Sequence, residues 1–220
     1  MQRRRWGGIL PALRLGVLVS GNGTNLQAVI DSIESGYLKA AVEVVISSRD
    51  GVYALERAKN HGIRTFVVRP EDYGGTEEYE EEMIKLLNGA GVDLVVLAGF
   101  IKVLSLHFVR AFSGRIINIH PSLIPSFCGR GFYGTRVHRA ALEYGVKVTG
   151  ATVHFVDEGT DTGPIILQKA VAVEDDDTPE SLAARVLRVE HELLPEAIKL
   201  YAENRLQVVG RRVLIRKEEF

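Results

Sequence analysis

The chain has a single cysteine, Cys128, among its 220 residues. One thiol forms no internal disulfide, which agrees with a reducing, cytoplasmic location. It also cannot build a structural zinc site, and the six histidines include no His-Glu-x-x-His pattern. We therefore predict a protein without a metal.

An excess of charge of one sign is missing too. The 27 Lys and Arg residues nearly balance the 28 Asp and Glu residues. Nucleic-acid-binding proteins normally carry a basic excess, so we expect no nucleic-acid partner. The local exception is Arg3 to Arg5, and the apolar run after it is broken by Pro11 and Arg14. We expect neither a signal peptide nor a membrane span, and we predict a loose tail at residues 1–12.

Apolar runs alternate with helix-period segments through the first half of the chain. Leu26, Val29, Ile30 and Ile33 recur on one helical stripe, whereas residues 94–97 are continuously apolar, as in a strand covered on both faces. The pattern predicts strands at 13–19, 42–47, 64–68, 93–98 and 115–120, and helices at 24–35, 52–60, 76–88 and 105–112. Such alternation is typical of a parallel sheet with right-handed crossovers.

The pattern changes after residue 120. A glycine-rich loop at Cys128–Gly134 and a short helix at 137–144 precede two long strands at 147–156 and 165–173. Asp177 or Thr178 caps a further helix that we expect to reach about residue 204, with a bend at Pro195.

These elements predict one domain over residues 1–220. Its class is α/β, with a Rossmann-like, mostly parallel sheet, helices on both faces and antiparallel strands in the C-terminal half. A small hairpin at 206–215 completes it.

The first predicted strand leads into the first helix through the segment Ser20-Gly21-Asn22-Gly23-Thr24-Asn25. The two glycines let the backbone turn tightly and approach a ligand, and the N–H groups at the helix start then face an anion. Three interpretations stay open: an ordinary glycine turn, a dinucleotide site, or a cradle for one phosphomonoester. A dinucleotide site is disfavoured because Leu26 occupies the third glycine position and the second strand ends in Ser-Ser-Arg instead of an acid.

Asn118 and His120 stand two residues apart on a predicted strand, so their side chains project to the same face. The carboxyl ends of parallel strands are where open α/β sheets place their sites. An amide donor beside a histidine suits the attack of an amine on a carbonyl carbon. A hydrogen-bonded histidine at a strand end is the alternative, and these two residues alone do not decide.

An acidic glycine loop, residues 157–163, separates the two long strands. Its Asp161 can reach His120, and a nearby negative charge would raise the pKa of that histidine. A solvated connection whose aspartates cap turns is an equally simple interpretation.

Together these segments resemble the phosphoribosylglycinamide formyltransferases, the folate-dependent enzymes of purine synthesis. The resemblance extends from about residue 13 to 215 and rests on four motifs in order: Ser20–Leu26, Leu97–Phe100, Asn118–Leu123 and His154–Pro164. It implies a formyltransferase-type fold. It also implies transfer of the formyl group of the co-substrate 10-formyltetrahydrofolate to the amine of phosphoribosylglycinamide.

The resemblance assigns roles to individual residues. Asn118, His120 and Asp161 match the catalytic residues of the family. The positions that match the phosphoribosylglycinamide site are Gly23, Thr24, Asn25 and Glu190, with Leu187 to Glu190 as part of the wall. The positions that match the folate site are Ile101, Lys102, Val103, Leu104 and Asn118, and the loop residues Asp157, Glu158, Gly159, Thr160 and Asp161.

The implied mechanism is direct attack of the neutral amine on the formyl carbon. We predict that the Asn118 amide and a protonated His120 stabilise the charge that develops on oxygen, as an oxyanion hole does. Asp161 would orient His120, raise its pKa and hold a water that moves the amine proton.

The chain departs from the family in three places. Thr76 stands near a position where many relatives carry an arginine that helps to hold the folate. The loop Cys128–Gly134 is longer than in shorter relatives, and Met1 to Pro11 have no counterpart that we recognise.

Formyltetrahydrofolate hydrolases and methionyl-tRNA formyltransferases share the Asn-x-His-Pro core. The former normally add an N-terminal regulatory domain and the latter a C-terminal nucleic-acid-binding domain, and we expect neither here. A non-catalytic nucleotide-binding module and a cysteine enzyme that uses Cys128 with His120 are alternatives of other classes. We expect small-molecule substrates, no membrane partner, and a monomer or homodimer.

Overall fold

The computed structural model describes residues 12–217, so residues 1–11 of the tail predicted at 1–12 lie outside the described residues. The strands are β1 (Leu13–Val19), β2 (Ala40–Ser47), β3 (Arg64–Val67), β4 (Leu94–Leu97), β5 (Ile116–His120), β6 (Val148–Phe155), β7 (Ile165–Ala172), β8 (Leu206–Val209) and β9 (Arg212–Ile215). The helices are α1 (Thr24–Glu34), α2 (Tyr53–Asn60), α3 (Thr76–Gly89), α4 (Leu106–Ala111), α5 (Thr135–Tyr144) and α6 (Pro179–Ala202), with a 3₁₀ turn at Pro70–Asp72.

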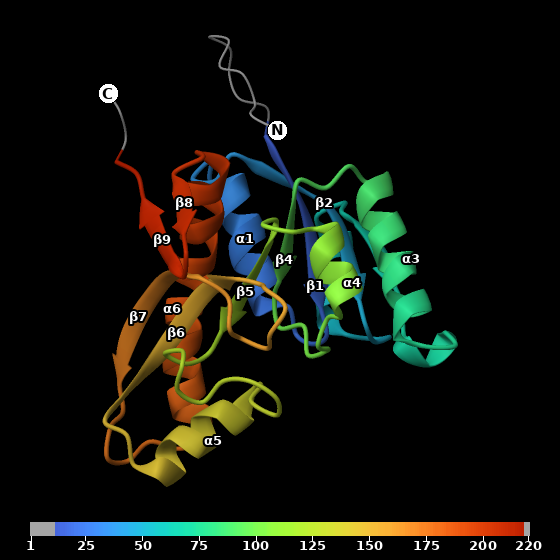
Figure 1. Cartoon of the computed structure of the whole chain (residues 1–220). Helices are drawn as coiled ribbons and strands as arrows, with labels where there is room; N and C mark the ends of the chain where they lie inside the picture. Colours follow the sequence, from blue (N-terminus) through green and yellow to red (C-terminus); the bar gives the residue numbers. More distant parts are fainter. Residues whose placement is uncertain (1–11, 218–220) are drawn as a thin grey trace.

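These strands form one nine-stranded sheet in the order β3-β2-β1-β4-β5-β6-β7-β9-β8 (Figure 1). The pairs from β3 to β5 are parallel, and β6 runs antiparallel to both β5 and β7. The predicted mostly parallel sheet with an antiparallel C-terminal half is therefore confirmed. The predicted terminal hairpin is β8 and β9, and it extends the sheet because Ile165 of β7 pairs with Arg212 of β9.

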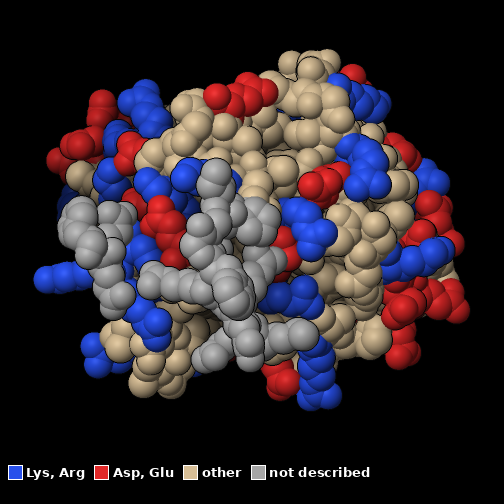
Figure 2. Space-filling model, turned by 90° about the horizontal axis from the view of Figure 1, so that it is seen from above, with Lys and Arg blue, Asp and Glu red and all other residues tan. Residues whose placement is uncertain are grey.

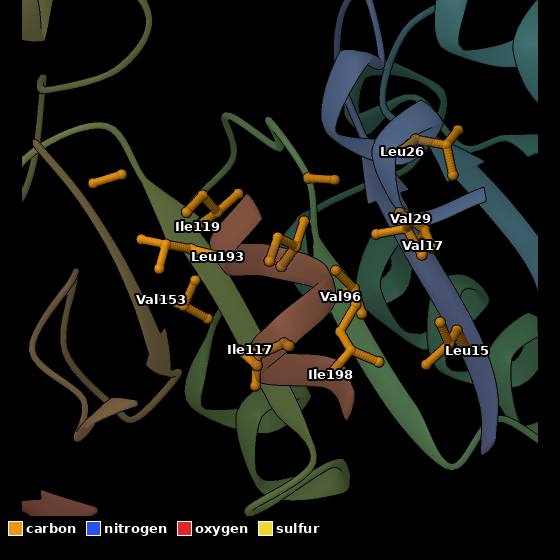
Figure 3. Close-up of a cluster of buried hydrophobic side chains, with 14 of the residues drawn as sticks. Leu15, Val17, Leu26, Val29, Val96, Ile117, Ile119, Val153, Leu193 and Ile198 are labelled. Carbon is orange, nitrogen blue, oxygen red and sulfur yellow. The ribbon is translucent and has the colours of Figure 1, made fainter. Parts of the chain in front are cut away.

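Helices cover both faces of the sheet, as predicted. One core cluster joins apolar residues of α1, α2 and α6 to one face, and a second joins residues of α3 and α4 to the other. Figure 3 shows Leu193 and Ile198 of α6 against Ile117, Ile119 and Val153 of the sheet. Within residues 12–217, no helix has the length and apolar character needed to cross a membrane.

The two faces of β5 position the site. Ile117 and Ile119 belong to the core under α6, whereas Ile116 packs in the cluster of α3 and α4. Asn118 and His120 share the face of Ile116, because side chains alternate along a strand. Beyond Ile116 this face lines a cavity instead of meeting the helix layer.

Helix α6 begins with a capping box. The Ser181 backbone N–H donates to Thr178 Oγ1 at 3.2 Å, and the Thr178 N–H donates to Ser181 Oγ at 2.9 Å. The helix continues through Pro195, which is buried. Of the two capping residues proposed from the sequence, Thr178 is therefore the N-cap.

Replacing Thr178 by alanine is expected to lower the free energy of unfolding by about 1 kcal/mol, because one helix N–H loses its acceptor. For a chain of this size the melting temperature should fall by about 2–4 °C. Thr178→Ser keeps the oxygen and should melt close to the unaltered protein. Equal melting temperatures for all three proteins would show that the cap adds no stability.

Candidate active site

A cavity of about 790 Å³ lies at the carboxyl ends of β1, β4 and β5. Its lining comes from the loops that follow these strands, from the loop between β6 and β7, and from α6. This is the edge of the sheet where the strand pattern predicted a site.

The three predicted catalytic residues meet in this cavity. Asp161 Oδ2 lies 3.6 Å from His120 Nδ1. The Asn118 amide Nδ2 donates to Asp161 Oδ1 across 3.5 Å, which is long for a hydrogen bond. The carboxylate therefore stands between the amide and the imidazole.

Two residues that hold the site together, one in the segment after β5 and one in the acidic loop, have an uncommon backbone conformation. Phe127 and Asp161 are non-glycine residues with left-handed φ values of 50° and 57°. Phe127 O accepts a hydrogen bond from His120 Nε2 at 3.0 Å, and the Gly129 N–H donates to Asp161 Oδ2 at 2.8 Å. Backbone strain of this kind collects at functional sites because the surrounding structure holds the strained residues in place.

These contacts define the protonation of His120. A carbonyl oxygen only accepts, so Nε2 carries the hydrogen and the lone pair of Nδ1 faces Asp161. Burial lowers the pKa of His120, and this outweighs the raising effect of Asp161. Asp161 therefore acts in the predicted direction, but the net pKa of His120 is below the usual value, which favours the neutral ring over the predicted protonated one.

Asp161 is ionised. Burial raises its pKa, but contacts with His154, His120 and the Gly129 N–H together hold that pKa below the usual value. These directions of the two pKa values favour a neutral imidazole, whose Nδ1 lone pair then faces the carboxylate.

Two buried histidines of the cavity received no role from the sequence. His154 lies on β6 opposite Asn118, and its Nε2 is 3.2 Å from Asn118 Nδ2. His138 on α5 is only 4% exposed, and its Nδ1 has no hydrogen-bond partner among the described residues. Burial, followed by the proximity of His120, lowers the pKa of His138 to about 4. His154 was missed because its position opposite Asn118 depends on the antiparallel register of β5 and β6, which the sequence does not show.

The predicted phosphoribosylglycinamide residues gather at one end of the cavity, which Thr24, Asn25 and Glu190 line. Asn25 Nδ2 donates to Glu190 Oε2 at 2.6 Å, and burial raises the pKa of Glu190. Asn25 Oδ1 is buried and has no partner among residues 12–217. Gly23 does not line the cavity: it has a φ of 73°, and a Cβ there would meet the Ala54 side chain at 2.6 Å. Gly23 therefore shapes the loop.

The predicted folate residues Ile101 to Leu104 line another wall, which buried side chains anchor at both ends. The Ile101 N–H donates to Ser20 Oγ at 3.2 Å, and the Ser105 N–H donates to Glu80 Oε1 at 2.7 Å. Both acceptors are buried. This wall is thereby fixed to the end of β1 and to α3.

The acidic loop contributes Asp157, Gly159, Thr160 and Asp161 to the cavity. Glu158 is the exception among the predicted residues of this loop. Its exposed carboxylate pairs with Arg110 at 3.2 Å, and it does not line the cavity. Side chains in an irregular loop follow no regular alternation, so the sequence gave no basis for distinguishing Glu158 from its neighbours.

Two of the departures from the family pattern differ in their distance from the site. Thr76 begins α3 and does not line the cavity, whereas Gly129 to Gly134 form part of its wall.

The site does not favour a cysteine enzyme. Burial and the negative charge of Asp161 raise the pKa of the Cys128 thiol, which opposes the thiolate that a cysteine enzyme needs. Among residues 12–217, no group of three or more His, Cys, Asp or Glu side chains could hold a metal ion.

The sequence matches the family model described as formyl transferase over residues 13–198. The trifunctional purine biosynthetic protein adenosine-3 of Drosophila melanogaster is 46% identical over 189 residues, which make up 85% of this chain but 14% of that protein. The phosphoribosylglycinamide formyltransferase of Escherichia coli (strain K12) is 41% identical over 192 residues, or 87% of this chain and 88% of that one. The crystal structure of glycinamide ribonucleotide transformylase 1 from Symbiobacterium toebii is 45% identical, has a TM-score of 0.92 and covers 97% of this chain and 99% of that chain. The chain therefore belongs to the formyl transferase family and, within it, to the phosphoribosylglycinamide formyltransferases.

Proposed function

We propose that this chain transfers the formyl group of 10-formyltetrahydrofolate to the amine of phosphoribosylglycinamide, a step of purine synthesis. The observation that carries this proposal is the convergence of Asn118, His120 and Asp161 in one cavity. An amide donor, a neutral imidazole and a carboxylate are groups that can stabilise the developing charge and move a proton during formyl transfer to an amine.

The acceptor fits the end of the cavity at α1. The first N–H groups of this helix lack intrahelical partners, so they suit the phosphate of the acceptor. The unpartnered Asn25 Oδ1 and the neighbouring Glu190 carboxylate suit hydroxyl donors, which a ribose supplies. The relatives named as phosphoribosylglycinamide formyltransferases support the same acceptor.

The folate donor fits the wall at Ile101 to Leu104. Leu97, Phe100 and Val156 add apolar surface for a flat ring, and Asp157 and Asp161 add acceptors. When bound, the folate supplies an activated formyl carbon. Family membership supports a folate donor of this kind.

The geometry supports a defined path for the proton. The Asn118 N–H holds the negative charge that develops on the formyl oxygen as the amine attacks. His120 Nδ1 has a free lone pair and takes the proton that the amine loses, directly or through a water. Asp161 stabilises the resulting imidazolium, because its carboxylate faces Nδ1. The same proton then passes to the folate nitrogen as its bond to the formyl carbon breaks.

The charge pattern on one face agrees with small-molecule substrates. On the face seen in Figure 2, Lys and Arg side chains of the described residues are interspersed with Asp and Glu. A nucleic-acid-binding face would instead gather basic side chains.

The proposal is tested by mixing the purified protein with a 10-formylfolate donor and following release of the deformylated folate by absorbance. We expect release only when phosphoribosylglycinamide is present. Release without the acceptor would identify a hydrolase instead. No release under either condition, combined with binding of a nucleotide, would favour the non-catalytic module.

A further inference from the structure

His154 is the direct cross-strand neighbour of Asn118. The two residues are paired in the antiparallel register of β5 and β6. Side chains that stand opposite each other in such a pair are close enough to interact. His154 is only 1% exposed, so both of its ring nitrogens must find partners inside the protein.

The partners of His154 define the direction of its hydrogen bonds. Nδ1 lies 2.8 Å from the Phe155 carbonyl oxygen, which can only accept, so Nδ1 carries the hydrogen. In the neutral ring Nε2 is then an acceptor, and Asp161 Oδ1, at 3.7 Å from it, is beyond hydrogen-bond distance. Asn118 Nδ2, at 3.2 Å, donates to it.

This chain of hydrogen bonds favours one orientation of the Asn118 amide. The two ends of an asparagine amide have almost the same shape, so packing alone does not distinguish them. In the flipped orientation the amide oxygen would face the Nε2 lone pair and Asp161 Oδ1, which are both acceptors. The observed orientation avoids this repulsion and places the N–H groups on the side of Asp161.

We propose that His154 is a positioning residue that keeps the Asn118 amide turned with its N–H toward the reacting oxygen. This inference rests on the proposed function. His154 takes one hydrogen of Nδ2, and the other has only the long 3.5 Å contact with Asp161. The second hydrogen is thus available to the formyl oxygen of a bound donor.

The experiment compares His154→Met, which removes the acceptor, with His154→Gln, whose side-chain oxygen can replace it. The turnover number of His154→Met is expected to fall about tenfold or more, because the oxyanion donor is lost in a part of the molecules. The KM values for donor and acceptor should change by less than about threefold, since the cavity wall keeps its apolar bulk. His154→Gln should recover a large part of the turnover.

A double variant separates positioning from packing. If His154 acts through Asn118, adding His154→Met to Asn118→Ala should cost less than about threefold in further turnover. A second loss as large as the first, or equal losses in His154→Met and His154→Gln, would overturn the proposal. If His154→Met does not fold, His154→Leu, which also lacks the acceptor, decides in the two backgrounds: a loss in the Asn118 protein that disappears in Asn118→Ala supports the proposal, and no loss or an additive loss overturns it.

The unaltered protein separates this inference from the proposed function. Absence of acceptor-dependent release in the unaltered protein would reject formyl transfer itself, and the inference with it. Normal release in the unaltered protein with additive losses in the variants would reject only the role of His154.

Discussion

His120→Ala is expected to fold as the unaltered chain does and to lose about a hundredfold or more of its turnover. The proposed mechanism passes the amine proton to the lone pair of the His120 imidazole, and the alanine side chain cannot accept it. Asn118→Ala should lose turnover to a similar extent, because removing one oxyanion donor typically costs about 10²–10³. Steady-state rates at saturating donor and acceptor, with melting temperatures as the folding check, measure both effects.

His107→Ala is the matched control for the histidine variant. His107 is half-exposed and pairs with Glu81 of α3 at 2.9 Å, and it does not line the cavity. Its loss should leave turnover close to that of the unaltered protein. Near-normal rates in both His120→Ala and Asn118→Ala would remove the proposed mechanism while leaving the fold and the family membership intact.

The placement of Asn118 and His120 could be predicted from the sequence because it depends on local periodicity. Side chains two apart on a strand share a face, and the continuous apolar runs identified the parallel strands whose carboxyl ends form the site. The same reasoning gave β1 its bounds at Leu13–Val19.

The protonation of His120 could not be predicted in this way. Its pKa depends on how completely other segments bury it, and that burial comes from elements distant in sequence. Phe127, whose carbonyl accepts from His120 Nε2, adopts a left-handed φ, which is rare for a bulky residue. A sequence pattern gives no indication of such a conformation.

The role of His154 depends on long-range register. The sequence indicated two strands, but opposing residues are known only once the pairing of β5 with β6 is fixed. A shift of one residue would turn the other face of the strand toward the site. Glu158 illustrates the opposite limit, because it lies in an irregular loop where no period predicts which side chains face inward.

Asp161→Asn is expected to lower turnover by about a hundredfold and to change the pH profile. Loss of the triad carboxylate of a serine protease costs still more, about 10⁴, for a comparable reason: the histidine loses the group that orients it and stabilises its charged form. Asparagine is the suitable replacement, since it tolerates a left-handed φ and can still accept from the Gly129 N–H. The fold should therefore survive the change.

The shift of the profile follows from the direction of each effect on His120. Burial lowers the pKa of His120, and the charge of Asp161 partly opposes that lowering. Without the charge, the pKa of His120 falls further, so the neutral ring persists to lower pH. The acid limb of kcat/KM, which reports the free enzyme, should move to lower pH. Asp175→Asn is the control because this exposed aspartate pairs with Lys147 away from the cavity, and its profile should match that of the unaltered protein. A lowered rate with an unmoved acid limb would mean that Asp161 orients His120 without tuning its protonation, and the proton would then have to move through another group.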